Sequence, residues 1–209
     1  MHEEKEVIRP QPSHELRTPG FQIEPSNELA DWMMNTFVHE DGQLWNADHG
    51  HLQSANIAAI WTNVEFEDGL MPVAGMAEIV RVNGKPWPRA ERTDHLCLLH
   101  GNVPQARIWL YAPNVVTLDD ASFCALVEHE LYHLAQKHDK NTEPMFDDEG
   151  RPVLTNRSHD VGEFLGVVER YGVGGVHSNV KKLVDVAKQK PKIERALIQI
   201  ACGTCAATA

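Results

Sequence analysis

The most regular pattern of apolar residues in the chain lies between residues 120 and 138. Apolar side chains recur there at intervals of three and four residues, which places them on one broad face of an α-helix. They are Phe123, Leu126, Val127, Leu131 and Leu134. The run Thr117-Leu-Asp-Asp120 directly precedes them and supplies side chains that can cap a first helical turn. The sequence therefore predicts a long amphipathic helix over about residues 120–138.

Three other segments show helical spacing. The first starts at Pro25-Ser-Asn27, a typical helix-start sequence, and continues to Gly42. The second follows Ser158 and runs from His159 to about Tyr171. The third covers about residues 178–201 and is interrupted by Pro191. Helices are predicted in all three, and the polar segment 139–157 is predicted to be a loop.

Strands are predicted between the first helix and the long one. Alternating or continuous β-branched and aromatic residues favour strands in four segments: His51–Asn63, Gly75–Val82, Leu96–His100 and Arg107–Tyr111. Asn83-Gly84 is a typical hairpin turn, because both residues tolerate a positive φ. We therefore predict an α+β fold in which a small, mostly antiparallel sheet packs against the long helix. The sequence shows no internal repeat.

The 209 residues are divided into three parts. Residues 1–24 are polar and contain several prolines, so we expect a flexible tail that orders only where it docks. Residues 25–178 are expected to form one domain, and residues 179–209 a helical extension that contains Cys202-Gly-Thr-Cys205. The acidic start lacks the apolar run of a signal peptide, and no segment approaches the roughly 18 apolar residues of a membrane span. We expect no export and no membrane contact.

Charge and cysteine content exclude several functions. The chain has 19 Lys and Arg against 30 Asp and Glu, a net charge of −11, which disfavours nucleic-acid binding. Cys97 and Cys124 lie in apolar stretches and are expected to be buried. Cys202 and Cys205 offer only half of a tetrahedral zinc site, so a structural or incidental role is expected. The 12 histidines indicate metal chemistry instead.

The strongest chemical motif is His129-Glu-Leu-Tyr-His133, inside the predicted long helix. Histidines four residues apart lie on the same helix face, so both imidazoles can bind one Zn²⁺ ion. In such helices the carboxylate that follows the first histidine, here Glu130, reaches the water on the metal and serves as a general base. His49 and His51 flank Gly50 and could line a cleft, but no spacing singles them out.

A catalytic zinc site needs a third protein ligand. We predict His159, because the 25 residues after His133 allow the chain to return antiparallel. Glu163 lies four residues further on and would accept a hydrogen bond from one of the motif imidazoles. The reverse assignment stays open, with Glu163 on the metal and His159 beside it or acting on the substrate. Asp160 is a weaker candidate, and His138 follows His133 too closely to share its face.

The motif residues resemble a known family. Ala125–His133 is similar to the motif helix of the putative phage metallopeptidases, which bacteriophages and prophages encode. The similarity extends to His159–Phe164, Val167–Gly172, Ile108–Ala112 and the region 51–75, and covers roughly residues 25–175. Glu128 stands where the family pattern has Asp. The resemblance implies a phage origin, a zincin-like fold and a metal-dependent peptidase activity. An acidic chain without an export signal is expected in the cytoplasm of the bacterial host.

The first hypothesis is therefore a zinc-dependent peptidase. His129, His133 and His159 would hold Zn²⁺, which lowers the pKa of its water and polarises the scissile carbonyl. Glu130 would take the water proton and pass it to the leaving amine. The strand that precedes the motif helix suits a peptide or protein substrate that pairs with a sheet edge, and Trp109 on that strand could border the groove.

The second hypothesis is a non-enzymatic, phage-encoded interaction module with a structural or vestigial zinc site. In that case the fourth coordination position would be closed, by Asp160 or Glu163. A third hypothesis, a protease associated with nucleic acid through the basic segment Lys181–Lys192, is disfavoured by the net charge of −11. The sequence does not define the oligomeric state.

Overall fold

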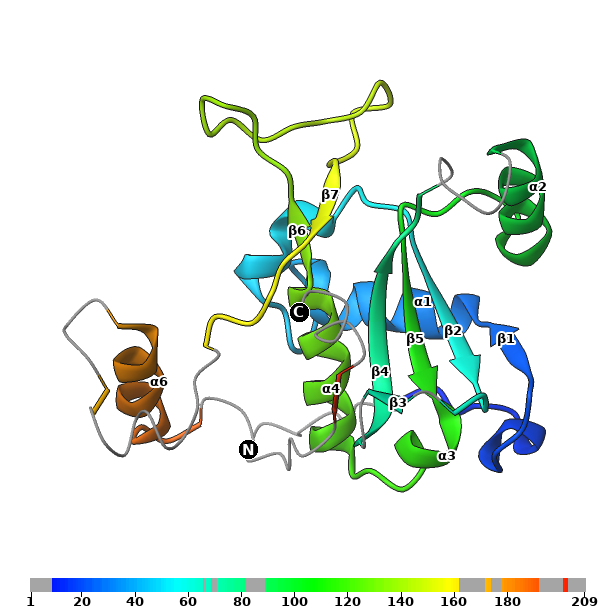
Figure 1. The fold of residues 1–209 in the computed structure, drawn as a ribbon, viewed down its shortest axis with the longest axis horizontal. Coiled ribbons are helices and arrows are strands. Elements are labelled where there is room, and N and C mark those ends of the chain that lie inside the picture. The colour runs from blue at the N-terminus through cyan, green and yellow to red at the C-terminus, as the bar shows by residue number, and fades with distance from the viewer. Residues whose placement is uncertain are drawn as a thin grey trace.

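A mixed β-sheet forms the centre of the molecule (Figure 1). The computed structural model describes residues 9–65, 67–68, 71–81, 89–161, 172–173, 178–191 and 201–202. The strands follow the order β1-β2-β5-β4-β3, with β8 also paired to β4. They are β1 (Ile23–Pro25), β2 (Ile57–Thr62), β3 (Glu67–Asp68), β4 (Met71–Ile79), β5 (Ala106–Tyr111) and β8 (Ala201–Cys202). The pairs β2–β5 and β4–β8 are parallel and the others antiparallel, so the fold is α+β with a mixed sheet.

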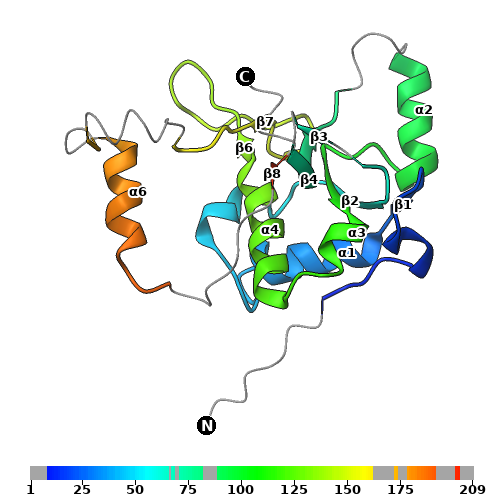
Figure 2. The ribbon, with the colours of Figure 1, turned by 60° about the horizontal axis from the view of Figure 1, so that its bottom comes forward.

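One face of the sheet carries the main core. Helix α1 (Asn27–Met33) and helix α4 (Asp120–Tyr132) cover this face, as Figure 2 shows. Phe123 of α4 packs between the rings of Trp61 and Trp32, with ring centroids 6.2 and 5.5 Å away. Alternate residues of β5 point to the other face, where Arg107 and Trp109 bind Glu78 near helix α2 (Arg89–His100). The strand periodicity thus separates an apolar face under α4 from a polar face beneath α2.

The described N-terminal residues dock on this core. They include a 3-10 helix, η1 (His14–Arg17), whose Leu16 is buried. The guanidinium group of Arg9 donates a 2.6 Å hydrogen bond to the Leu118 carbonyl oxygen and lies 3.0 Å from the Asp120 carboxylate. It also lies over the ring of Phe123. The segment expected to order only where it docks is therefore tied to the start of α4.

Helix α4 begins as predicted and ends early. The Asp119 side chain accepts a 2.7 Å hydrogen bond from the Ser122 amide, and this bond lowers the pKa of the Asp119 carboxyl. The predicted end near residue 138 is wrong, because the helix ends at Tyr132 and β6 (Leu134–Gln136) follows. Strand β6 pairs antiparallel with β7 (Leu154–Asn156). A pairing with residues some 20 positions away thus replaces the local helix.

Other boundaries also differ from the prediction. Helix α1 starts at the expected cap, Ser26, and continues as a π-helix, η2 (Met34–Val38). The predicted strand His51–Asn63 starts only at Ile57, because Ala47–Leu52 form a 3-10 helix, η3. The predicted strand Leu96–His100 is wrong: it is the end of α2, where Leu96 is buried and Leu98 is 86% exposed. An apolar run of that length does not distinguish a strand from a helix.

The C-terminal half departs further from the prediction. A short helix, α3 (Ala112–Val115), joins β5 to α4. Residues 157–161 are extended or bent rather than helical, and the rest of the helix predicted up to Tyr171 lies outside the described residues, as does the Asn83-Gly84 turn. Helix α6 covers Asn179–Ala187 and is capped by Ser178. The last residue of the predicted helix, Ala201, belongs to β8 instead, and residues 192–200 lie outside the described residues.

The segment between β6 and β7 contains a structural repeat that the sequence does not reveal. Two successive eight-residue turns, 137–144 and 145–152, project from the β6–β7 pair (Figure 1). In each turn an Asp side chain, Asp139 or Asp147, accepts hydrogen bonds from the amides two and four residues later. Each turn also contains one residue of positive φ, Thr142 or Gly150. Only the Asp and the final Pro are identical between the two halves, which explains why the repeat is hidden in the sequence.

Candidate metal centre

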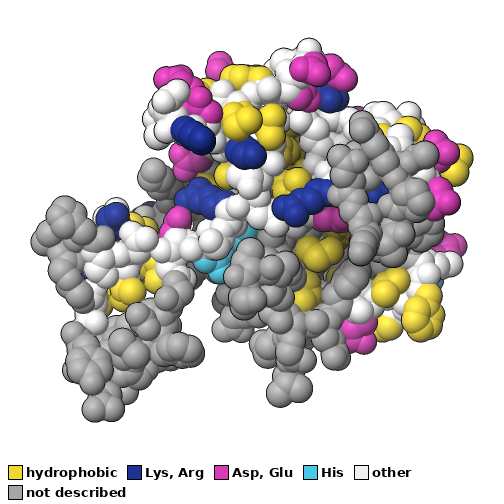
Figure 3. Space-filling view, turned by 45° about the horizontal axis from the view of Figure 1, so that its top comes forward, with side chains coloured by type: hydrophobic (Ala, Val, Ile, Leu, Met, Phe, Trp, Pro, Cys, Tyr) yellow, Lys and Arg dark blue, Asp and Glu magenta, His cyan; other side chains and the backbone are white. Residues whose placement is uncertain are grey.

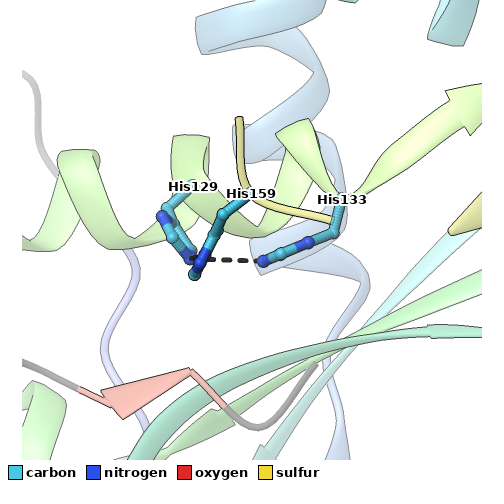
Figure 4. A group of neighbouring side chains, drawn as sticks. All are labelled: His129, His133 and His159. Atoms are coloured by element: carbon cyan, nitrogen blue, oxygen red, sulfur yellow. Dashed lines mark hydrogen bonds between the residues drawn. The ribbon is translucent and has the colours of Figure 1, made fainter. Parts of the chain in front are cut away.

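Three histidine side chains converge beside α4 (Figure 4). The Nε2 atom of His129 lies 3.3 Å from Nε2 of His133 and 3.2 Å from Nε2 of His159. All three ligand atoms lie within 4.8 Å of one another. Tetrahedral zinc with Zn–N bonds of about 2.0–2.1 Å holds neighbouring nitrogens about 3.4 Å apart. The spacing of these imidazoles therefore fits a shared metal ion.

A pair of hydrogen bonds joins His133 to Arg157. The Arg157 carbonyl oxygen accepts a 2.7 Å hydrogen bond from Nδ1 of His133, and the Arg157 amide donates a 2.9 Å bond to the His133 carbonyl. The bond at Nδ1 selects the tautomer whose Nε2 lone pair faces the other histidines. The bond at the backbone extends the β6–β7 pairing by one residue. It brings the chain back to the helix end, so that His159, two residues later, reaches His129.

Burial favours the neutral, metal-binding form of His129 and His159. Desolvation, with smaller contributions from His133 and His159, lowers the pKa of His129 to about 4. Desolvation and His133 also lower the pKa of His159. His133 is 3% exposed, whereas His159 is exposed. The exposure of His159 leaves the cluster in contact with solvent on one side, and Figure 3 shows histidine side chains at the molecular surface.

Glu130, the predicted base, lies between α4 and the sheet. It follows His129 directly and is fully buried. Its carboxylate lies against β4 at Gly75: a Cβ atom on Gly75 would stand 3.0 Å from Oε1 of Glu130 and 3.0 Å from Cδ1 of Leu126. A glycine at this position of β4 therefore leaves the space that the Glu130 side chain fills.

A polar network holds the opposite side of the motif helix. The side-chain amide of Asn46 donates 2.8 Å hydrogen bonds to Oε1 of Glu128 and to the hydroxyl of Tyr132. The Tyr132 hydroxyl in turn donates to Asp48 at 3.0 Å. His49 is 1% exposed and packs edge-on against the Tyr132 ring, 4.6 Å between centroids. Because Glu128 directly precedes His129 and Tyr132 directly precedes His133, this network fixes the rotation of α4 about its axis.

Most of this network is not evident in the sequence. The motif pattern gives Tyr132 no role, and His49 and His51 are predicted only as residues that could line a cleft. Both histidines do line a cavity of about 290 Å³ beside Tyr132. Nε2 of His51 lies 2.7 Å from the Leu134 carbonyl oxygen, so His51 also binds the end of the motif segment. The i,i+4 spacing of Glu128 and Tyr132 was the one signal available in the sequence.

The π-helix η2 positions Asn46. Its carbonyl groups at Thr36 and Phe37 accept 3.0 Å hydrogen bonds from the amides of Leu44 and Asn46. The chain between them turns at Gly42, where a Cβ atom would lie 2.6 Å from the carbonyl oxygens of both Asn35 and Thr36. Only a residue without a side chain fits there, so this turn fixes where Asn46 meets α4.

The structure places the other predicted site residues as follows. Glu163 and Cys205 lie outside the described residues. Asp160 forms an ion pair with Arg157 at 2.7 Å, and His138 is exposed in the first of the tandem turns. The indole of Trp109 donates to Glu78 on the sheet face opposite α4, so it does not border a groove on the Glu130 side.

The sequence predicts that Cys97 and Cys124 are both buried, and the structure places one of them inside and the other at the surface. Cys124 is buried as predicted, and burial raises the pKa of its thiol to about 11. The expectation for Cys97 is wrong, because it is exposed on α2, which the sequence presented as a buried strand.

The fold and the histidine cluster define a class: an α+β protein in which His129 and His133 of a His-Glu-x-x-His motif, together with His159 from the segment after β7, could hold a metal ion. The family model of the putative phage metallopeptidases matches residues 30–188, about three quarters of the 209-residue chain, and the chain belongs to this family. Comparisons with curated proteins and with solved structures gave no match. Within the described residues, no helix has the length and apolar character of a membrane span.

The turn at Gly42 generates the first prediction. Gly42→Ala is expected to lower the free energy of unfolding by about 2 kcal/mol or more, because its Cβ would overlap backbone oxygens that cannot move independently. Urea denaturation followed by circular dichroism measures the change. Gly50→Ala is the matched control, since a Cβ there meets nothing within 4 Å. Equal stability of the two variants would contradict the close packing of this turn.

Proposed function

We propose that the chain is a zinc-dependent peptidase whose metal is bound by Nε2 of His129, His133 and His159. The observation that carries the proposal is the convergence of these three nitrogens at the spacing of a tetrahedral metal site. Three imidazoles suit zinc among the common divalent ions, because calcium and magnesium prefer oxygen ligands. The family assignment independently implies a metal and a peptide or protein substrate.

Glu130 is the general base of the proposed reaction. When bound, the metal supplies a Lewis acid that polarises the scissile carbonyl and acidifies water. Glu130 accepts the proton of the attacking water and delivers it to the leaving amine. Its carboxylate is shielded from solvent between α4 and Gly75 of β4, which restricts its position next to His129.

The surroundings of the cluster favour catalysis over a purely structural metal. A structural zinc site is normally closed by four protein ligands. Among the described residues, no further His, Cys, Asp or Glu joins the three histidines, and Asp160 is engaged by Arg157. The exposure of His159 opens the cluster toward solvent. These observations support an open fourth position, where water and substrate can bind.

Metal content tests the ligand set. Inductively coupled plasma mass spectrometry should find one zinc per wild-type chain. His159→Ala should lose it, because two imidazoles on one helix bind zinc far more weakly than three ligands. Glu163→Ala should keep it. The opposite result for the two variants would make Glu163 the third ligand, and a wild-type chain without stoichiometric metal would refute the site.

Glu130→Gln tests the base. The variant should lose about 10²–10⁴-fold in kcat toward an unstructured protein such as casein, because the amide cannot accept the proton. Zinc content should stay at the wild-type value. Glu128→Gln is the control on the same helix, since its amide oxygen can still accept the hydrogen bond from Asn46. Turnover by Glu130→Gln at the wild-type rate would eliminate the mechanism.

Gly75→Ala tests how the base is positioned. The added methyl group would meet Oε1 of Glu130 at 3.0 Å and push the carboxylate from its place. We expect kcat to fall by about tenfold, the order of loss that a small misplacement of a reacting group produces, while KM and zinc content change little. Gly50→Ala again serves as the control. Unchanged kcat in Gly75→Ala would show that the Glu130 carboxylate acts from a different position.

A further inference from the structure

The edge of β4 beside the candidate site carries a strand from the C-terminal part of the chain. Strand β8 pairs parallel with β4, with Val73 opposite Ala201 and Gly75 opposite Cys202. Gly75 is also the residue that Glu130 packs against. Figure 4 shows β8, in pale red, on the same side of α4 as the three histidine rings. One residue of β4 therefore contacts both the proposed base and the added strand.

This edge is suited to an extended peptide. The inner edge of β4 is filled by β5, with Gly75 opposite Leu110 and Ala77 opposite Ile108. Among the described residues, β3 pairs with β4 at Pro72 and Met71, and the pairing at Val73 and Gly75 on the outer edge is with β8. Extended peptides bind such edges through main-chain hydrogen bonds, largely independently of their side chains. Strand β8 uses that same main-chain surface, so a second strand cannot pair there simultaneously.

We propose that Ala201–Cys202 is an intramolecular competitor, which occupies the strand-addition surface that an extended peptide substrate uses on β4. This inference rests on the proposed peptidase function and adds a control of access to the site. Strand β8 has only two paired residues, and its pairing shifts register between Val73 and Gly75. So short a pairing is weak and readily displaced. The covalent connection of β8 to the rest of the chain compensates for this weak pairing, because a tethered segment acts at an effective concentration in the millimolar range.

Proline substitutions test the competition. The double variant Ala201→Pro/Cys202→Pro removes both amide donors and cannot form the ladder. Its KM for a peptide substrate should fall at least fivefold, with kcat and zinc content unchanged. Cys202→Ser keeps the backbone amide and should behave like the wild type. If Cys202→Ser alone lowers KM to the same extent, the thiol rather than the strand is responsible, and the proposal fails.

A binding measurement tests occupancy without requiring turnover. A fluorescein-labelled peptide with the sequence of residues 197–204, carrying serine at 202, should bind the double-proline variant at least tenfold more tightly than the wild type in fluorescence anisotropy. Hydrogen exchange at the amides of residues 73–75 should be faster in that variant. Equal peptide binding and equal hydrogen exchange in the wild type and the double-proline variant would show that β8 does not occupy this edge of β4, whatever the activity of the protein.

The combination of the two measurements separates the two proposals. Faster exchange and tighter peptide binding in a chain without peptidase activity would refute the proposed function and leave the strand-addition surface intact. Faster exchange with an unchanged KM would show that substrate enters elsewhere, which overturns the competition. Cleavage of the purified wild-type chain near residue 202, detected by intact mass, would make the segment a substrate rather than a competitor.

Discussion

The reciprocal hydrogen bonds between His133 and Arg157 are the contact on which the candidate metal centre depends. One bond orients an imidazole through its Nδ1 atom, and the other anchors the chain that carries His159. Neither bond involves the Arg157 side chain, so any residue able to hold this backbone geometry could form them. The strand pairing of β6 and β7 therefore positions His159, the proposed third ligand.

The motif helix is held on two sides by different means. Toward the sheet, α4 buries Phe123 among aromatic rings and places the Glu130 carboxylate against Gly75. Burying a carboxylate there opposes folding, and the apolar contacts of the same helix offset that penalty. On the other side, Asn46 and Asp48 hold Glu128 and Tyr132 by hydrogen bonds. Apolar packing thus stabilises the helix, and the polar network fixes its orientation about the helix axis.

Periodicity predicted those parts of the fold in which residues close together in sequence determine which side chains are buried. The start of α4, the capped start of α1 at Ser26 and the strand Ala106–Tyr111 follow from spacing and caps in short windows. The errors occur where pairing with a segment distant in sequence determines the local structure. Leu134 leaves the helical pattern because Asn156 pairs with it, and Asn46 meets Glu128 across 82 positions of sequence. His159 was predicted at the cluster because an antiparallel return was expected, although the return is a strand rather than a helix.

The long connection between β6 and β7 is compatible with a well-ordered site because it consists of two short turns, each closed by its own hydrogen bonds. The amide of Met145 binds the Lys137 carbonyl, that of Val153 binds Met145, and that of Lys137 binds Val153, at 2.8–2.9 Å. These bonds bring the two ends of the excursion together at the base of both turns. The connection therefore consists of two eight-residue turns, each held by hydrogen bonds to an aspartate side chain, instead of one flexible loop about twice as long. The tandem turns thereby hold β6 against β7, and the register of that pair places Arg157 opposite His133.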